Sequence, residues 1–176
     1  METDSQFLFI SQIVLSLVVY TLVARWYLAP VLARLSLVQA LTPLLLFHAT
    51  RYIGATFLTP SVIDARVPSS FTVPGAVGDL LAVLLALVAL AALRGGSRFT
   101  LPLLWVFNLE GTLDFAVAFI QGVRVGLPYY QLGATWFIPT MLVPAYLVVH
   151  ILIFRMLLTR AHELRGPSEM AQASLT

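Results

Sequence analysis

Six ionisable side chains lie within otherwise apolar segments of the sequence, namely His48, Arg51, Asp79, Glu110, Asp114 and His150. Such groups are costly to remove from water unless they are paired, so inside apolar segments they usually face the protein interior. Carboxyl, imidazole and guanidinium groups gathered there can pass protons, hold a cation or bind a polar head group. We therefore expect the chemistry of this chain at these positions.

Spacing arranges four of these residues on two levels. His48 and Arg51 are three residues apart and Glu110 and Asp114 are four apart, so each pair shares one face of a helix. Straight helices would place His48 and Glu110 about 15 Å from their outer ends, Arg51 about 10 Å and Asp114 about 9 Å. The sequence thus predicts an Arg51–Asp114 pair and, beneath it, a His48–Glu110 pair.

An outward-facing polar pocket built from these residues is the first functional hypothesis. Arg51 would keep Asp114 ionised, while Glu110 and His48 at the bottom would bind or relay a small ligand, a cation or a proton. Asp79, nearer the rim, completes the predicted ligand-binding set.

Two other classes of protein remain open. A membrane-embedded enzyme would use Glu110 and His48 as its catalytic acid/base pair on a lipid-like substrate. A non-catalytic scaffold or subunit would use Arg51 and Asp114 only to pin two helices together. Ligand-dependent stabilisation, lipid turnover that stops in a Glu110→Gln variant, or a stable co-purifying partner would distinguish the three classes.

The remaining polar residues have simpler interpretations. Asp79 follows Gly78 and could be the N-cap of a helix that begins there. His150 fits a buried core histidine whose hydrogen bonds are made within the protein. Asn108 and Thr112 fall away from the acidic stripe, where hydrogen bonds between helices would explain them.

The sequence predicts no cofactor and no metal. A haem ligated by both His48 and His150 is disfavoured, because straight helices put these residues about 7–8 Å apart in depth. A metal held by His48, Glu110 and Asp114 is disfavoured because Arg51 beside it would repel the ion.

Composition points to a lipid environment. Of the 176 residues, 60% are hydrophobic and 10% are charged, whereas a soluble domain has about 25% charged residues. The absence of cysteine excludes disulfides and thiolate metal sites, and no basic run is long enough to suggest nucleic-acid binding. The expected partners are the lipid bilayer and a small-molecule or ion ligand.

Five segments reach the length of about 20 residues that a bilayer crossing needs. They are residues 7–28, 35–58, 76–93, 101–120 and 135–158. We therefore predict an all-α, multi-pass helical bundle over residues 1–158, followed by a polar cytoplasmic tail at 159–176. Prolines at 43, 139 and 144 should interrupt the second and fifth helices.

The arginines predict the orientation. Seven of them would face one side of the membrane, namely Arg25, Arg34, Arg94, Arg98, Arg155, Arg160 and Arg165. Only Arg66 and Arg124 would face the other side, and Arg51 lies within a span. Because positive residues stay on the cytoplasmic side, we expect the N-terminus outside and the C-terminus in the cytoplasm of a cell that carries the protein in its cytoplasmic or plasma membrane.

Overall fold

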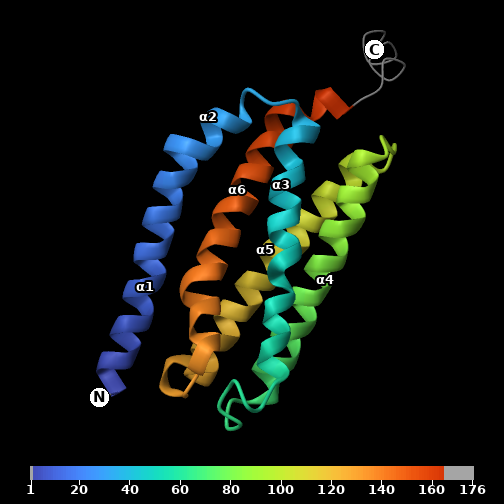
Figure 1. Ribbon diagram of the computed structural model, residues 1–176. Coiled ribbons are helices and arrows are strands. Elements are labelled where there is room, and N and C mark those ends of the chain that lie inside the picture. The colour runs from blue at the N-terminus through green and yellow to red at the C-terminus, as the bar shows by residue number, and fades with distance from the viewer. Residues whose placement is uncertain (1, 165–176) are drawn as a thin grey trace.

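The computed structural model describes residues 2–164, which form helices and short connections with no strand among them. The longer helices run side by side in one bundle (Figure 1). In chain order the elements are α1 (Glu2–Val23), η1 (Ala24–Leu28), α2 (Ala29–Leu32), α3 (Leu37–Ala49), η2 (Thr50–Leu58), α4 (Ser69–Arg94), α5 (Thr100–Val125), η3 (Leu127–Tyr129), η4 (Gly133–Trp136), η5 (Ile138–Leu142), α6 (Val143–Arg160) and η6 (Ala161–Leu164). The predicted tail at 159–176 is helical as far as Leu164, and the rest of it lies outside the described residues.

Four helical stretches are long and apolar enough to cross a membrane. They are residues 4–32, 69–94, 100–125 and 133–164. Each contains one predicted span, which confirms the apolar helical character of those four segments. The predicted second span, 35–58, is not one α-helix, because α3 ends at Ala49 and η2 continues as a 3₁₀ helix.

Side-chain chemistry accounts for the change at Thr50. Residues 50–58 (TRYIGATFL) combine β-branched residues with a glycine, all weak α-helix formers. The hydroxyl groups of Thr50 and Thr56 each donate to the carbonyl three residues earlier, at 2.7 Å in both cases. These local bonds accompany the tighter 3₁₀ coil, whose backbone hydrogen bonds also span three residues.

Helix α4 begins earlier than the sequence suggested. It starts at Ser69 and runs through Pro74, so Asp79 lies well inside the helix. The prediction that Asp79 is an N-cap is therefore wrong. Proline near the start of a long helix removes only one backbone hydrogen bond, which the remaining turns outweigh.

Two apolar clusters divide the interior of the bundle. The larger one contains Leu41, Leu45, Ala86, Leu104, Phe107, Ile153 and other residues toward the end that carries the α2–α3 linker. The smaller one, at the opposite end, is formed by Phe9, Phe57, Ile63, Val67, Phe71, Leu127, Leu132 and Ile138. Along the chain, Arg51, Asp79 and Asp114 fall between residues of the two clusters, whereas His150 falls among residues of the larger one.

The two loops beside the smaller cluster are joined through Asp64. Its backbone N–H donates to the Gln131 carbonyl at 3.0 Å, and its carboxylate accepts from Gln131 N at 3.4 Å and from Arg66. The hydrogen-bonded Arg66 guanidinium holds the pKa of the Asp64 carboxyl well below its usual range. Gly133 adopts a left-handed φ of +53°, and a β-carbon there would lie 2.7 Å from the Val62 carbonyl oxygen.

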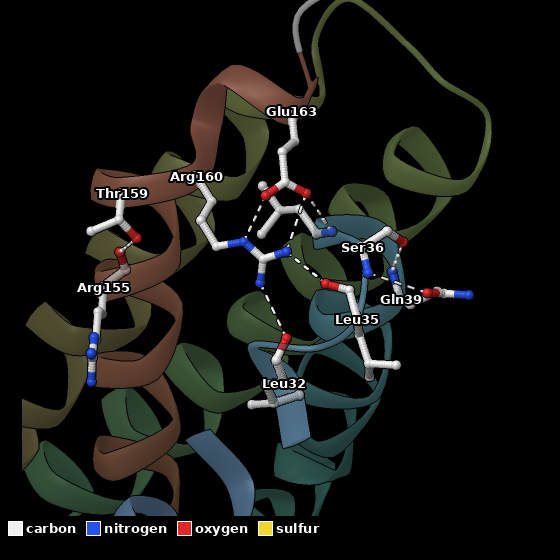
Figure 2. Close-up of polar contacts among 9 residues, drawn as sticks. Leu32, Leu35, Ser36, Gln39, Arg155, Thr159, Arg160 and Glu163 are labelled. Carbon is white, nitrogen blue, oxygen red and sulfur yellow. Dashed lines mark hydrogen bonds and ion pairs between the residues drawn. The ribbon is translucent and has the colours of Figure 1, made fainter. Parts of the chain in front are cut away.

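At the other end, Arg160 fastens α6 to the α2–α3 linker (Figure 2). Its guanidinium donates to the carbonyl oxygens of Leu32 at 3.1 Å and Leu35 at 2.6 Å, and to Glu163. Glu163 in turn accepts a hydrogen bond from the Leu37 backbone N–H at 3.0 Å. The start of α3 and the end of α6 are thus tied by one charged network.

Replacing Arg160 with alanine should destabilise the protein by about 1–3 kcal/mol, because two linker carbonyls and Glu163 lose their charged donor. Thermal melting in detergent measures the loss. Arg34→Ala is the matched control, since Arg34 is exposed in the same linker and its side chain has no hydrogen bond within residues 2–164. Equal melting temperatures for the two variants would contradict the role given to Arg160.

Candidate functional site

Arg51 is the centre of the buried polar site. Its side chain is fully buried at the joint between α3 and η2. Nε donates to Asp79 of α4 at 2.7 Å, and Nη2 donates to Asp114 of α5 at 2.5 Å. The guanidinium carbon also lies 3.9 Å from the centre of the Phe115 ring. One cation therefore joins three helical segments through two carboxylates.

Three glycines provide the space for this arrangement. A β-carbon would lie 1.8 Å from Asp79 Oδ2 at Gly54, 1.8 Å from Asp114 Oδ1 at Gly78, and 2.7 Å from His150 Nε2 at Gly111. Real side chains do not approach so closely, so each glycine admits one polar group between the helices. Glycine is required at these three positions because a side chain would collide with the facing polar group. None of the three has a backbone dihedral that itself requires glycine.

A pair of imidazoles lies next to the arginine. The rings of His48 and His150 have centroids 4.1 Å apart, and both residues are buried. Asn108 donates to the His150 carbonyl at 3.3 Å, so its side-chain oxygen faces His150 Nδ1 at 2.6 Å and accepts a hydrogen bond from it. That bond leaves Nε2 of His150 as the bare acceptor nitrogen. Within residues 2–164 neither nitrogen of His48, nor Nε2 of His150, has a hydrogen-bond partner.

Two hydrogen-bond predictions made from the sequence have opposite outcomes. The Arg51–Asp114 pair is confirmed. The His48–Glu110 pair is wrong, because the His48 ring packs against Phe107 and His150 and its nitrogens make no hydrogen bond to a described residue. Glu110 is half-buried, and its Oε2 atom is buried without a partner among the described residues.

The predicted depth difference between His48 and His150 is also wrong. The 3₁₀ turns of η2 rise about 2.0 Å per residue instead of 1.5 Å, which carries His48 about 4–5 Å deeper than a straight α-helix would. The π-helical turn at Ile138–Leu142, which contains Pro139, shifts the start of α6 as well. The two histidines therefore meet at one level.

The close contact between the two histidines argues against haem binding, and the position of Arg51 argues against a metal ion. A haem iron needs its two axial histidines on opposite faces of the macrocycle, and two rings whose centroids are 4.1 Å apart leave no room for it. In the described part of the chain, no three histidine or acidic side chains are placed to share a metal ion. The Arg51 guanidinium itself occupies the space between Asp79 and Asp114.

The predicted outward-opening pocket is not supported. His48 and Arg51 are both 0% exposed, and neither of two surface cavities found over residues 2–164 is lined by a residue of the site. Small parts of the carboxylates reach the surface, with the side chains of Asp79 and Asp114 11% and 14% exposed. The structure therefore shows a closed centre in place of a pocket that reaches His48.

Several residues of the site were missed or assigned elsewhere. Asn108 belongs to the site because it is hydrogen-bonded to His150. A hydrogen bond from Asn108 to another helix was predicted, but its partner was not. Thr112 instead donates to the Asn108 carbonyl within its own helix. The hydroxyl groups of Thr50 and Tyr146 lie 2.7 Å apart beside the imidazoles. The sequence signal for the close approach of the helices was a glycine three residues from each charged residue, namely Gly54 after Arg51 and Gly111 before Asp114.

Comparisons with curated proteins and with solved structures gave no match. A family profile described as a domain of unknown function (DUF8737) matches residues 8–158. That range contains every residue of the buried site and the helices that place them, apart from the last two residues of α6. The chain therefore belongs to the family of the domain of unknown function DUF8737.

Proposed function

We propose that the chain is a multi-pass membrane protein with five crossings, its N-terminus outside and its C-terminus in the cytoplasm. Four apolar helical stretches support four crossings, and α3 with η2 supplies the fifth. In Figure 1, α1 begins at one end of the bundle and α6 finishes at the other, as an odd number of crossings requires. The outward faces of these helices carry large apolar side chains, among them Leu15, Leu84, Leu113 and Ile151.

Within this protein, we propose that the buried centre binds and releases a proton, as part of proton relay or proton-coupled transport. The observation that carries the proposal is a charge imbalance. One guanidinium, Arg51, faces the carboxyl groups of Asp79 and Asp114, while Glu110 has a buried oxygen without a partner among the described residues. Arginine stays charged, so three ionised carboxylates would leave the centre with two uncompensated negative charges. Bound protons remove that excess.

A proton fits this centre better than a metal cation. The guanidinium already fills the space between Asp79 and Asp114, and it would repel a second cation there. A proton needs no coordination sphere and can be held by any one carboxyl oxygen. The Asp114 side chain is 14% exposed and Glu110 is half-buried, so a proton could enter and leave through Asp114.

The imidazole pair extends this centre toward the cytoplasmic side. A β-carbon at Gly111 would touch both His150 Nε2, at 2.7 Å, and Arg51 Nη1, at 2.9 Å, so the two groups share one small space. The bare Nε2 of His150 can accept a proton, and the neighbouring His48 ring offers two more nitrogens. Neutral imidazoles next to carboxyl groups are suited to proton transfer.

The other two classes of function find less support. The enzyme hypothesis needed a Glu110–His48 acid/base pair, and these side chains are not hydrogen-bonded to each other. A scaffold would be served by the Arg51 network alone and gives no reason for Glu110 or for the unpartnered imidazole nitrogens. The scaffold remains an outcome of the experiment below.

Vesicles containing the purified protein and a pH-sensitive dye test the proposal. After an external acid pulse, the wild-type protein should acidify the lumen, whereas Glu110→Gln should reduce the rate at least tenfold because a proton-holding group is lost. Infrared difference spectra should show the C=O band of a protonated carboxyl that disappears in the same variant. Asp64→Asn, in the outer loop, is the control and should behave as wild type. A carboxyl band without proton flux would mean binding without transport, and the absence of both would favour a scaffold.

A further inference from the structure

A second site lies at the opposite end of α6 from the smaller apolar cluster. A cavity of about 150 Å³ opens between α2 and the last turns of α6. Its lining residues are Ala29, Leu32, Ala33, Leu152, Arg155, Met156, Thr159 and Arg160. Most of this lining is aliphatic, and the polar groups all come from α6. The cavity therefore combines an apolar floor with a cationic edge.

Arg155 is the free cation of this cavity. Its side chain is exposed, and it makes no hydrogen bond or ion pair to any residue of the described range 2–164. Arg160, by contrast, is committed to Leu32, Leu35 and Glu163, and these bonds hold the wall of the cavity in place (Figure 2). A fixed wall with one unpaired guanidinium is suited to an anion that arrives from outside the protein.

The charged residues around this cavity are also mostly positive. The loops and helix ends on this side of the bundle carry Arg25, Arg34, Arg94, Arg98, Arg155 and Arg160, against the single described acidic residue Glu163. Glu163 is already bonded to Arg160. In the proposed orientation this end faces the cytoplasmic leaflet, whose anionic lipids are attracted by basic residues at the membrane surface.

We propose that this cavity binds the headgroup phosphate of an anionic phospholipid of the cytoplasmic leaflet, with Arg155 as its cation. The acyl chains lie along the aliphatic floor formed by Leu32, Leu152 and Met156. An apolar floor of this kind favours a lipid over free phosphate, which would gain nothing from it. The proposal depends on the membrane placement of the chain but not on proton exchange at Arg51, so either can fail alone.

Native mass spectrometry of the full chain, released from detergent with added lipid, tests the site. Phosphatidylglycerol should remain bound to the wild-type protein in preference to phosphatidylcholine. Arg155→Gln should weaken phosphatidylglycerol binding roughly five- to tenfold. Arg98→Gln, at the same end but outside the cavity, is the matched control and should bind as wild type. Ala29→Leu should also weaken binding, because its side chain enters the cavity.

Two further measurements separate lost binding from lost folding, and a bound lipid from free phosphate. Melting curves without lipid should coincide for wild type and Arg155→Gln, which separates lost binding from lost folding. Inorganic phosphate in large excess should not displace phosphatidylglycerol, and full displacement would show a phosphate site in place of a lipid site. Equal retention of phosphatidylglycerol by wild type and Arg155→Gln would overturn the proposal.

Discussion

Replacing both Asp79 and Asp114 with asparagine should destabilise the protein by about 3–5 kcal/mol, because the buried Arg51 then loses both carboxylates to which it is hydrogen-bonded. The arginine is 0% exposed and bonds to both carboxylates, at 2.7 and 2.5 Å. It cannot escape by losing its proton, since guanidinium groups stay protonated in proteins. Phe115 at 3.9 Å and the Gly111 carbonyl at 3.4 Å would remain as weak substitutes.

Adding Arg51→Gln to the double variant should restore most of the loss, because the stranded charge is removed. Unfolding in a detergent series measures all three proteins in one background. Asp64→Asn is the matched control, since it also removes a carboxylate that bonds to an arginine, but in a loop where the Arg66 side chain is 76% exposed. Because the Arg66 partner is solvated, this variant should lose much less stability than the double variant, even with the loop contact to Gln131 weakened. If the triple variant is no more stable than the double one, the buried charge is not the cause.

Gly78→Ala should release Asp114 from Arg51. The new β-carbon would lie 1.8 Å from Asp114 Oδ1, so the carboxylate must turn away or α4 and α5 must separate. Either movement breaks the ion pair, and we expect a loss of about 2–3 kcal/mol from the combined overpacking and unpairing. The same variant should impair proton uptake if Asp114 contributes to it.

The contrast with Gly75→Ala makes this prediction specific. Gly75 lies one turn earlier in the same helix, and a β-carbon there meets nothing within 4 Å. Alanine is the better helix former, so Gly75→Ala should be neutral or slightly stabilising. Because Gly78→Ala and Asp114→Asn disturb one contact, their effects should not add in a double-mutant cycle. Additive losses would show that Gly78 acts elsewhere.

The residues of the centre could be found from the sequence because charge inside an apolar segment is rare. Arg51 and Asp114 stood out for that reason, and their similar depths along straight helices were enough to pair them. Asp79 was recognised as ionisable, but because it follows Gly78 it was also interpreted as the N-cap of a helix. The length of α4 overrides that local signal, and Asp79 becomes the second partner of Arg51.

The contacts of the imidazoles could not be derived in the same way. The position of His48 depends on a 3₁₀ segment that follows it, and the position of His150 depends on a π-helical turn that precedes it. Both are departures from the regular α-helix that periodicity assumes, and each accumulates an error of a few ångströms along the axis. The role of Gly78 was hidden for a different reason, because a missing side chain matters only once the facing residue is known.

The 3₁₀ segment also sets how far the second helical segment of the bundle, α3 with η2, extends. The 13 residues of α3 and the 9 residues of η2 together extend about 38 Å, since the tighter coil rises about 2.0 Å per residue. The 26 residues of α4 extend about 39 Å as a regular α-helix. A segment four residues shorter than its neighbour therefore spans nearly the same length, so the 3₁₀ coil compensates for the missing turn.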